Sequence, residues 1–86
     1  MPTISRFYGI TIRMFYNDHP PPHFHVEYGE FKAEMAIETL QVLAERLPRH
    51  ALGMTREWAE SHRAELLDDW ELCRQHKQPQ SIQPLE

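Results

Sequence analysis

The sequence predicts an α+β domain, in which a three- or four-stranded antiparallel meander is followed by one long or two consecutive α-helices packed on one sheet face. Two patterns support this prediction. Apolar residues alternate with polar ones along the first half of the chain, and they recur at helical spacing along the second half. The 86 residues have room for one domain with a modest core. Each half offers one apolar face, so we expect the two faces to pack together.

The alternating pattern predicts strands over residues 10–16, 23–28 and 31–37. Gly29-Glu30 lies between the last two and suits a two-residue turn of type II′, because glycine accepts the positive φ of its first position. Residues 38–47 suit either a short fourth strand or an irregular connection, and we favour the strand. The meander therefore precedes the helical part of the chain.

The outer face of this sheet is expected to be polar. His23 and His25 lie two residues apart on one strand, so they project from the same face, opposite the apolar one. We therefore expect no core role for either histidine. The contacts expected across this face are Glu27 with Lys32, His25 with Glu34, Arg13 with Glu27, and Phe15 with His25.

The second half of the chain predicts helix. Pro48 suits a first helical position. Ser61 can cap a second helix beginning at His62, so we favour two helices over one. The chain turns polar and proline-bearing from Gln75, so we assign residues 1–76 to the domain and residues 77–86 to an extended or mobile tail. The expected apolar stripe of the helices consists of Leu52, Thr55, Ala59, Leu66, Trp70 and Cys73, widened by Trp58 and Leu67.

Composition limits the possible partners. The net charge of −4, from 9 basic and 13 acidic residues, argues against direct binding of nucleic acid. Four arginines lie between Arg46 and Arg63, but glutamates are mixed among them. The single cysteine, Cys73, fits a reducing compartment. We expect a cytoplasmic protein without a membrane partner, because we find neither a signal-peptide-like run nor the roughly 20 apolar residues that a span needs.

The segment from Asp18 to His25, with the sequence Asp-His-Pro-Pro-Pro-His-Phe-His, is the most distinctive feature of the chain. Prolines fix φ and push the residue before them towards extended conformations. The connection is therefore expected to be stiff, and a stiff connection holds its flanking side chains at low entropic cost. We consequently expect the functional centre of the molecule here.

Two interpretations of this segment remain open. In one, the outer sheet face is an ordinary solvated surface with cross-strand charge pairs. In the other, His19, His23 and His25 bind a divalent metal ion, with Asp18 and Glu27 close by. For contacts with a protein partner, the candidate residues are Asp18, Phe24, Glu27, Trp58 and Trp70.

The sequence also resembles a known prokaryotic group, the domain-of-unknown-function family 4160 (DUF4160). The resemblance covers nearly the whole chain, and the Pro-Pro-His-Phe-His core is its most specific part. It implies no catalytic residues, because the family has none assigned. The residues that carry it are Pro2-Thr3-Ile4, Phe7-Tyr8-Gly9, Asn17 to His25, Tyr28-Gly29, Leu47-Pro48-Arg49, Trp58, His62-Arg63, Glu65-Leu66-Leu67 and Trp70.

Two functions follow as hypotheses. The resemblance implies a gene arrangement like that of toxin–antitoxin pairs, so the first is a protein-interaction or regulatory component. Its partner would be a small protein from the same operon or a second copy of the chain in a homo-oligomer. The alternative is a small metal-dependent hydrolase or nuclease that uses the histidine segment. Whether the chain is an enzyme stays open at this point.

Overall fold

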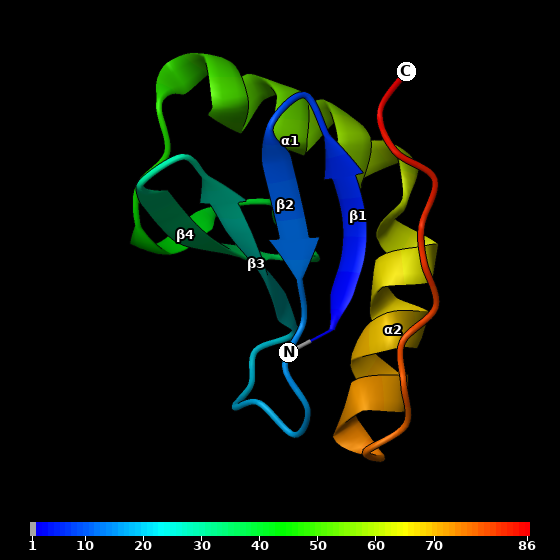
Figure 1. Cartoon of the computed structure of the whole chain (residues 1–86). Helices are drawn as coiled ribbons and strands as arrows, with labels where there is room; N and C mark the ends of the chain where they lie inside the picture. Colours follow the sequence, from blue (N-terminus) through cyan, green and yellow to red (C-terminus); the bar gives the residue numbers. More distant parts are fainter. Residues whose placement is uncertain (1) are drawn as a thin grey trace.

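The computed structural model describes residues 2–86 and consists of one antiparallel sheet followed by two helices (Figure 1). The five strands lie in the sheet in chain order, so the topology is a simple meander. The predicted α+β class is confirmed, with one strand more than expected. The elements are β1 (Thr3–Phe7), β2 (Ile10–Arg13), β3 (His23–Tyr28), β4 (Phe31–Ala36), β5 (Val42–Glu45), α1 (Arg49–Ser61) and α2 (Arg63–Arg74).

The additional strand is β1, which the alternating pattern did not reveal. Ile4 and Ser5 are both buried, and the register with β2 shifts between Thr3 and Ser5. This irregularity disturbs the period of two that identifies a strand in a sequence. The connection to β2 is the two-residue turn Tyr8-Gly9, in which both residues have positive φ (49° and 81°). Turns of this kind are typical of tight hairpins.

The hairpin between β3 and β4 agrees with the prediction. Gly29 has a φ of 59°, as the first position of a type II′ turn requires. The register pairs Glu27 with Lys32 and His25 with Glu34, as expected. The predicted fourth strand within residues 38–47 is present as β5.

The register between β2 and β3 differs from the expected one by two residues. Arg13 lies directly opposite His25, not opposite Glu27. Both expected side-chain contacts nevertheless form, because long side chains reach diagonal neighbours on a sheet. Arg13 Nε lies 3.1 Å from Glu27 Oε2, and the rings of Phe15 and His25 are 4.0 Å apart between centroids.

Two helices are present, as favoured, with the break at His62 (φ −127°, ψ 23°). Ser61 does not cap α2. Its hydroxyl donates back to the carbonyl of Glu57, and α2 begins one residue later than expected, at Arg63. Neither helix in the described part of the chain is long and apolar enough to cross a membrane.

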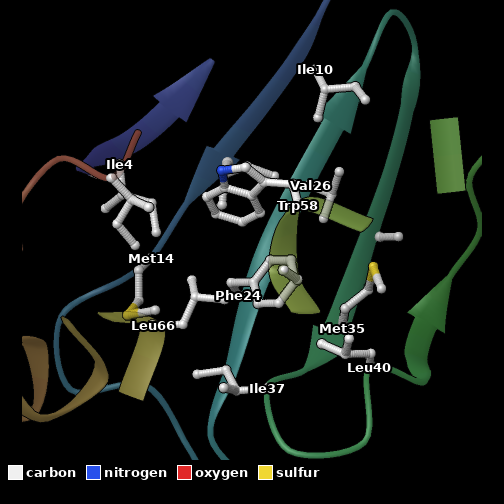
Figure 2. Close-up of a cluster of buried hydrophobic side chains, with 14 of the residues drawn as sticks. Ile4, Ile10, Met14, Phe24, Val26, Met35, Ile37, Leu40, Trp58 and Leu66 are labelled. Atoms are coloured by element: carbon white, nitrogen blue, oxygen red, sulfur yellow. The ribbon is translucent and has the colours of Figure 1, made fainter. Parts of the chain in front are cut away.

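Both helices cover the same face of the sheet and close the core. Trp58 of α1 lies at its centre, with ring centroids 5.3 Å from Phe7 and 6.1 Å from Phe24 (Figure 2). Leu67, expected to widen the buried stripe, is instead 40% exposed, so that prediction was wrong. The α2 side chain buried without having been expected is the carboxylate of Asp69.

The C-terminal segment, residues 77–86, has no regular secondary structure but packs on the domain. Figure 1 shows it in red, turning back at the end of α2 and running alongside α2 and β1. The amide of Ile82 donates to the carbonyl of Ile4 (2.8 Å), and the indole of Trp58 donates to the carbonyl of Gln83 (2.7 Å). The side chain of Ile82 is part of the hydrophobic core.

Candidate metal centre

The proline-rich connection between β2 and β3 is fastened at both ends. The amide of Asn17 donates to the carbonyl of Cys73, near the end of α2 (3.0 Å). The carbonyl of Pro22 accepts a hydrogen bond from the amide of Ile37, just beyond β4 (3.0 Å). Together with the restricted φ of the three prolines, these bonds hold the connection in one place.

One carboxylate oxygen is the meeting point of two imidazole rings. Oδ2 of Asp18 lies 3.0 Å from Nε2 of His23 and 2.9 Å from Nε2 of His25. The other oxygen, Oδ1, accepts the backbone N–H of His19 (2.8 Å). We refer to Asp18, His23 and His25 as the Asp18 cluster.

His23 is buried, contrary to the expectation for the outer sheet face. Only 1% of it is exposed, and its ring faces the indole of Trp70 at 5.2 Å between centroids. The reason is that Trp70 of α2 and the proline-rich connection cover the His23 ring. Strand alternation alone predicts that this ring faces solvent. His25, farther along the strand, is half-buried and remains within reach of solvent.

The hydrogen bonds of His23 constrain its protonation. Its Nδ1 lies 2.7 Å from the carbonyl oxygen of Pro21, which only accepts, so Nδ1 carries a proton and donates. Its Nε2 faces the Asp18 carboxylate, which also only accepts when ionised. Nε2 therefore either carries a second proton, making an imidazolium, or offers its lone pair to a cation between the two side chains.

Asp18 is held in its charged form. Burial raises the pKa of its carboxyl group, but hydrogen bonds from His25 and from the amide of His19, with the charges of His23 and His25, outweigh burial. The net pKa is below the ordinary value. An ionised carboxylate suits either an imidazolium partner or a metal ion.

A second set of donor atoms overlaps the first. In each of two groups, Asp18, His23 and His25, or His19, His23 and Glu34, the potential ligand atoms all lie within 4.8 Å of one another. Glu34 Oε1 is 3.5 Å from Nε2 of His23. Because both groups include His23, they describe one centre and not two.

The structure brings the three predicted ligands together, but in two overlapping groups. His23 and His25 meet at Asp18. The side chain of His19 is 74% exposed and belongs to the second group, with its ring centroid 5.2 Å from that of His23. Metal binding itself stays a prediction. Glu34 was expected only as a cross-strand partner of His25. Its nearness to His23 follows from the register, because a residue opposite His25 is a diagonal neighbour of His23 on the same sheet face.

A cleft opens beside the Asp18 cluster on the outer sheet face. Its volume is about 300 Å³, and its lining includes His25, Glu34, Lys32 and Phe15. A larger hollow, of about 620 Å³, lies elsewhere, over the solvent face of α1. The residues that line this larger hollow include no member of either ligand group, whereas His25 and Glu34 line the smaller cleft.

The residues proposed for partner contacts are mostly inside the fold. Phe24, Trp58 and Trp70 are buried, so in the isolated chain they offer no surface to a partner. Glu27 is half-buried and paired with Arg13. Asp18 belongs to the cluster described above. The large apolar side chains that are exposed are Tyr8, Tyr16, Leu43 and Leu67.

Other candidate groups have structural explanations. Cys73 is buried, and burial together with the charge of Asp69 raises the pKa of its thiol to about 11, so the thiol is unreactive. Arg56 and Arg63 use their Nε atoms to donate to the carbonyls of Leu40 and Ile37. These two arginines thus join the helices to the connection between β4 and β5.

Comparison with protein families decides the assignment. The model of a domain of unknown function, DUF4160, matches residues 9–71. The chain belongs to the DUF4160 family. The DUF4160 match runs from the turn of the first hairpin into α2 and contains the whole segment from Asp18 to His25. Neither the search of curated proteins nor the search of solved structures found a match.

Proposed function

We propose that this DUF4160 chain binds one divalent transition-metal ion through the Asp18 cluster and uses it to activate water for hydrolysis. The observation that carries the proposal is the convergence of three donor atoms within 4.8 Å on a fastened loop and a central strand. Two imidazoles and a carboxylate are a ligand set that zinc and iron accept, and three protein ligands leave coordination positions open.

The surroundings of His23 support the proposal. Ligating histidines normally donate their other ring N–H to a carbonyl or carboxylate, which fixes the tautomer and the orientation of the ring. The contact of Nδ1 with Pro21 provides this arrangement, and Trp70 packs against the ring. Burial of the ring excludes water from one side of the centre, while His25 faces the cleft.

Glu34 is the residue suited to act as general base. It lines the cleft, and its Oε1 is 3.5 Å from His23 Nε2. A carboxylate next to the metal ligands but outside the set of three can accept a proton from a bound water. The cleft beside it provides room for a small substrate or for one group of a larger one.

Metal affinity tests the first half of the proposal. Tag-free protein is equilibrated with Zn²⁺, Mn²⁺ or Fe²⁺, and bound metal is measured by elemental analysis. We expect one equivalent per chain. Asp18→Asn and His25→Ala should lower the affinity by more than the roughly 10- to 100-fold that loss of an outer-shell partner costs. His50→Ala, on the exposed face of α1, is the matched control and should bind as the unaltered chain does.

Generic ester substrates test the second half. The metal-loaded chain should cleave bis(p-nitrophenyl) phosphate or p-nitrophenyl acetate. Glu34→Gln should keep the metal but lose at least about 100-fold in turnover, because general base catalysis typically contributes that much. If the chain binds one equivalent of metal but cleaves neither compound, metal binding stands and the proposed hydrolysis is refuted.

A partner-binding role is the second candidate, and the edge of the sheet favours it. Leu43, on edge strand β5, is 45% exposed, and with Pro21, Pro22 and Ala36 it lines an apolar groove of about 300 Å³. An open edge strand accepts an added strand from another chain. We propose a small protein from the same operon, in a toxin–antitoxin-like pair, or a second copy as the occupant.

Co-purification with the product of the neighbouring gene, and the mass in solution, test this second candidate. Leu43→Lys should abolish either association while leaving the fold intact, because the residue is exposed. The partner-binding role would be contradicted if the unaltered chain is a monomer and co-purifies with no such partner.

A further inference from the structure

The C-terminal segment lies in a groove whose residues form hydrogen bonds with the main chain of the segment. We call this the tail groove and define it by Ile4 of β1, Trp58 of α1 and Asp69 of α2. Beyond Lys77, whose amide donates to the carbonyl of Leu72, three hydrogen bonds join the segment to this groove, and all use its main chain. Ile82 N–H donates to Ile4 (2.8 Å), Gln80 N–H donates to Asp69 Oδ1 (2.8 Å), and Gln83 C=O accepts from the Trp58 indole (2.7 Å).

The side chains of the segment contribute mainly by burial. Pro79 and Ile82 are the buried positions within it, and Ile82 is 3% exposed. Because the polar contacts are made by main-chain atoms, they do not depend on the side chains of the segment. Any extended peptide with an apolar residue at the place of Ile82 can make the same bonds, as in other cases where a strand is added to a sheet edge.

The native segment leaves one buried polar atom of the groove without a partner. Asp69 is 2% exposed, and among residues 2–86 its Oδ2 has no hydrogen-bond donor. Gln80 donates its backbone N–H to the Asp69 carboxylate but makes no hydrogen bond to Oδ2 with its side chain. Unmet buried polar groups are costly, so the native segment is an imperfect ligand.

We propose that the tail groove is a binding site for an extended segment of a partner protein, which carries an arginine or lysine at the place of Gln80 and an apolar residue at the place of Ile82. The chain's own segment is then a stand-in that the partner displaces. A charged donor at the first place pairs with the buried carboxylate of Asp69. A second copy of this chain offers the same Gln80, so it does not meet this requirement. The inference is independent of the metal centre.

The covalent attachment of the segment determines the affinity that a partner needs in order to displace it. A segment attached through a short linker is present at an effective concentration in the millimolar range. A peptide identical to the segment therefore competes poorly with it, whereas one that also satisfies Asp69 gains an advantage. This difference makes the inference measurable with peptides of defined sequence.

The experiment uses the full chain with Ile82→Asp, which places a charge in the apolar site and releases the segment. Fluorescence anisotropy measures the binding of labelled peptides that span residues 78–86. We expect the native peptide to bind, the peptide carrying Gln80→Arg to bind at least 10-fold more tightly, and the peptide carrying Ile82→Asp not to bind. Adding Asp69→Asn to the chain should remove the advantage of the arginine peptide.

Leu67→Asp is the matched control chain, because Leu67 is exposed on α2 and the native segment keeps its place. It should bind none of the peptides at concentrations at which the Ile82→Asp chain is saturated. Equal affinity of the native and arginine peptides would overturn the role assigned to Asp69. No binding of any peptide to a folded Ile82→Asp chain would overturn the groove itself.

Hydrogen exchange of the unaltered chain decides the matter if Ile82→Asp does not fold. The amides of Gln80 and Ile82 should exchange through a local opening, well before that of Val26 in central strand β3. Addition of the arginine peptide should speed their exchange further, because the segment is displaced. Exchange of Ile82 and Val26 at the same rate, unaffected by the peptide, would show that the segment is not displaceable.

Discussion

Both ring nitrogens of His23 are committed to oxygen atoms, one of Pro21 and one of Asp18. These two contacts stabilise the fold and also fix the orientation of the buried ring. Its environment depends on Trp70 of α2, which is remote in sequence, and on how the adjacent proline-rich connection folds, so strand alternation alone did not reveal it. Asp18 and His25, in contrast, were recognisable from the segment, because three histidines around a stiff connection are unusual.

Removal of His23 should therefore be costly. We expect His23→Ala to lower the free energy of unfolding of the metal-free chain by about 3 kcal/mol or more, because it removes a buried ring that packs against Trp70 and leaves the Pro21 carbonyl without its imidazole donor. His19→Ala is the control and should change it by less than about 0.5 kcal/mol, since that ring is largely exposed. Urea denaturation measures both. If both substitutions have similarly small effects, the contacts of the two ring nitrogens of His23 do not stabilise the fold.

Asp69 should make stability depend on pH in the opposite sense to an ordinary paired carboxylate. Burial, foremost, raises the pKa of Asp69, against a hydrogen bond from Gln80 that lowers it, and nearby Asp68 and Glu65 raise it further. Because its pKa is higher in the folded than in the unfolded state, ionisation destabilises the fold. This group's contribution to stability is greatest below the ordinary pKa of 3.8 and is lost as pH rises through the raised value.

The corresponding test compares Asp69→Asn with the unaltered chain from pH 4 to pH 7. The asparagine variant should gain stability relative to the unaltered chain as the pH increases, because asparagine does not ionise and still accepts the Gln80 amide. Glu60→Gln, on the exposed side of α1, should show a difference that changes less with pH. A difference between Asp69→Asn and the unaltered chain that is constant over this range would contradict a raised pKa.

At the scale of elements, local pattern determined most of the fold. Strands β2 to β4 and the helical half follow from apolar periodicity, and the turn at Gly29 follows from a local glycine preference. For residues 38–47, which contain β5, the sequence suited a strand or an irregular connection, and the strand was favoured. Strand β1 was not recognised, because a register shift beside Ser5 interrupts its alternation. Its pairing with β2 depends on tertiary contacts, above all burial of Ile4 and Phe7 against the helices, and these are not visible in a five-residue stretch.

Two glycines give a matched test of the elements. Gly29 has a positive φ of 59°, so Gly29→Ala should destabilise the fold by about 1 kcal/mol. Gly53 lies in the interior of α1 with no atom near the place of an added Cβ, so Gly53→Ala should stabilise the fold by about 0.5–1 kcal/mol. Thermal denaturation should thus show a lower melting temperature for Gly29→Ala and a higher one for Gly53→Ala. Equal signs would indicate that one of the two elements is wrongly assigned.

At the scale of the whole molecule, the last residues complete both the core and the edge of the sheet. Polarity and two prolines in residues 77–86 indicated only an extended or mobile tail, because one isoleucine among polar residues gives no periodic signal. The place of Ile82 depends on a slot formed by β1 and the helices. The candidate metal centre is likewise assembled from several elements: the connection after β2, strands β3 and β4, and Trp70 of α2.

Truncation of the buried side chain measures how far the C-terminal segment stabilises the molecule. Ile82→Ala should lower the free energy of unfolding by about 2 kcal/mol, the lower end of the range for large-to-small core substitutions, because a terminal segment can partly readjust. Ser81→Ala, exposed and adjacent, should have little effect. Equal stability of the two variants would show that the segment adds nothing to the core.

The central claim is that Asp18, His23 and His25 bind one divalent metal ion. X-ray absorption at the zinc edge of the tag-free chain, loaded with one equivalent of Zn²⁺, tests it most directly. We predict a first shell with two imidazole nitrogens at about 2.0–2.1 Å, and the loss of one imidazole from that shell in His25→Ala. A spectrum of hydrated zinc without imidazole, or one unchanged by His25→Ala, would contradict the claim.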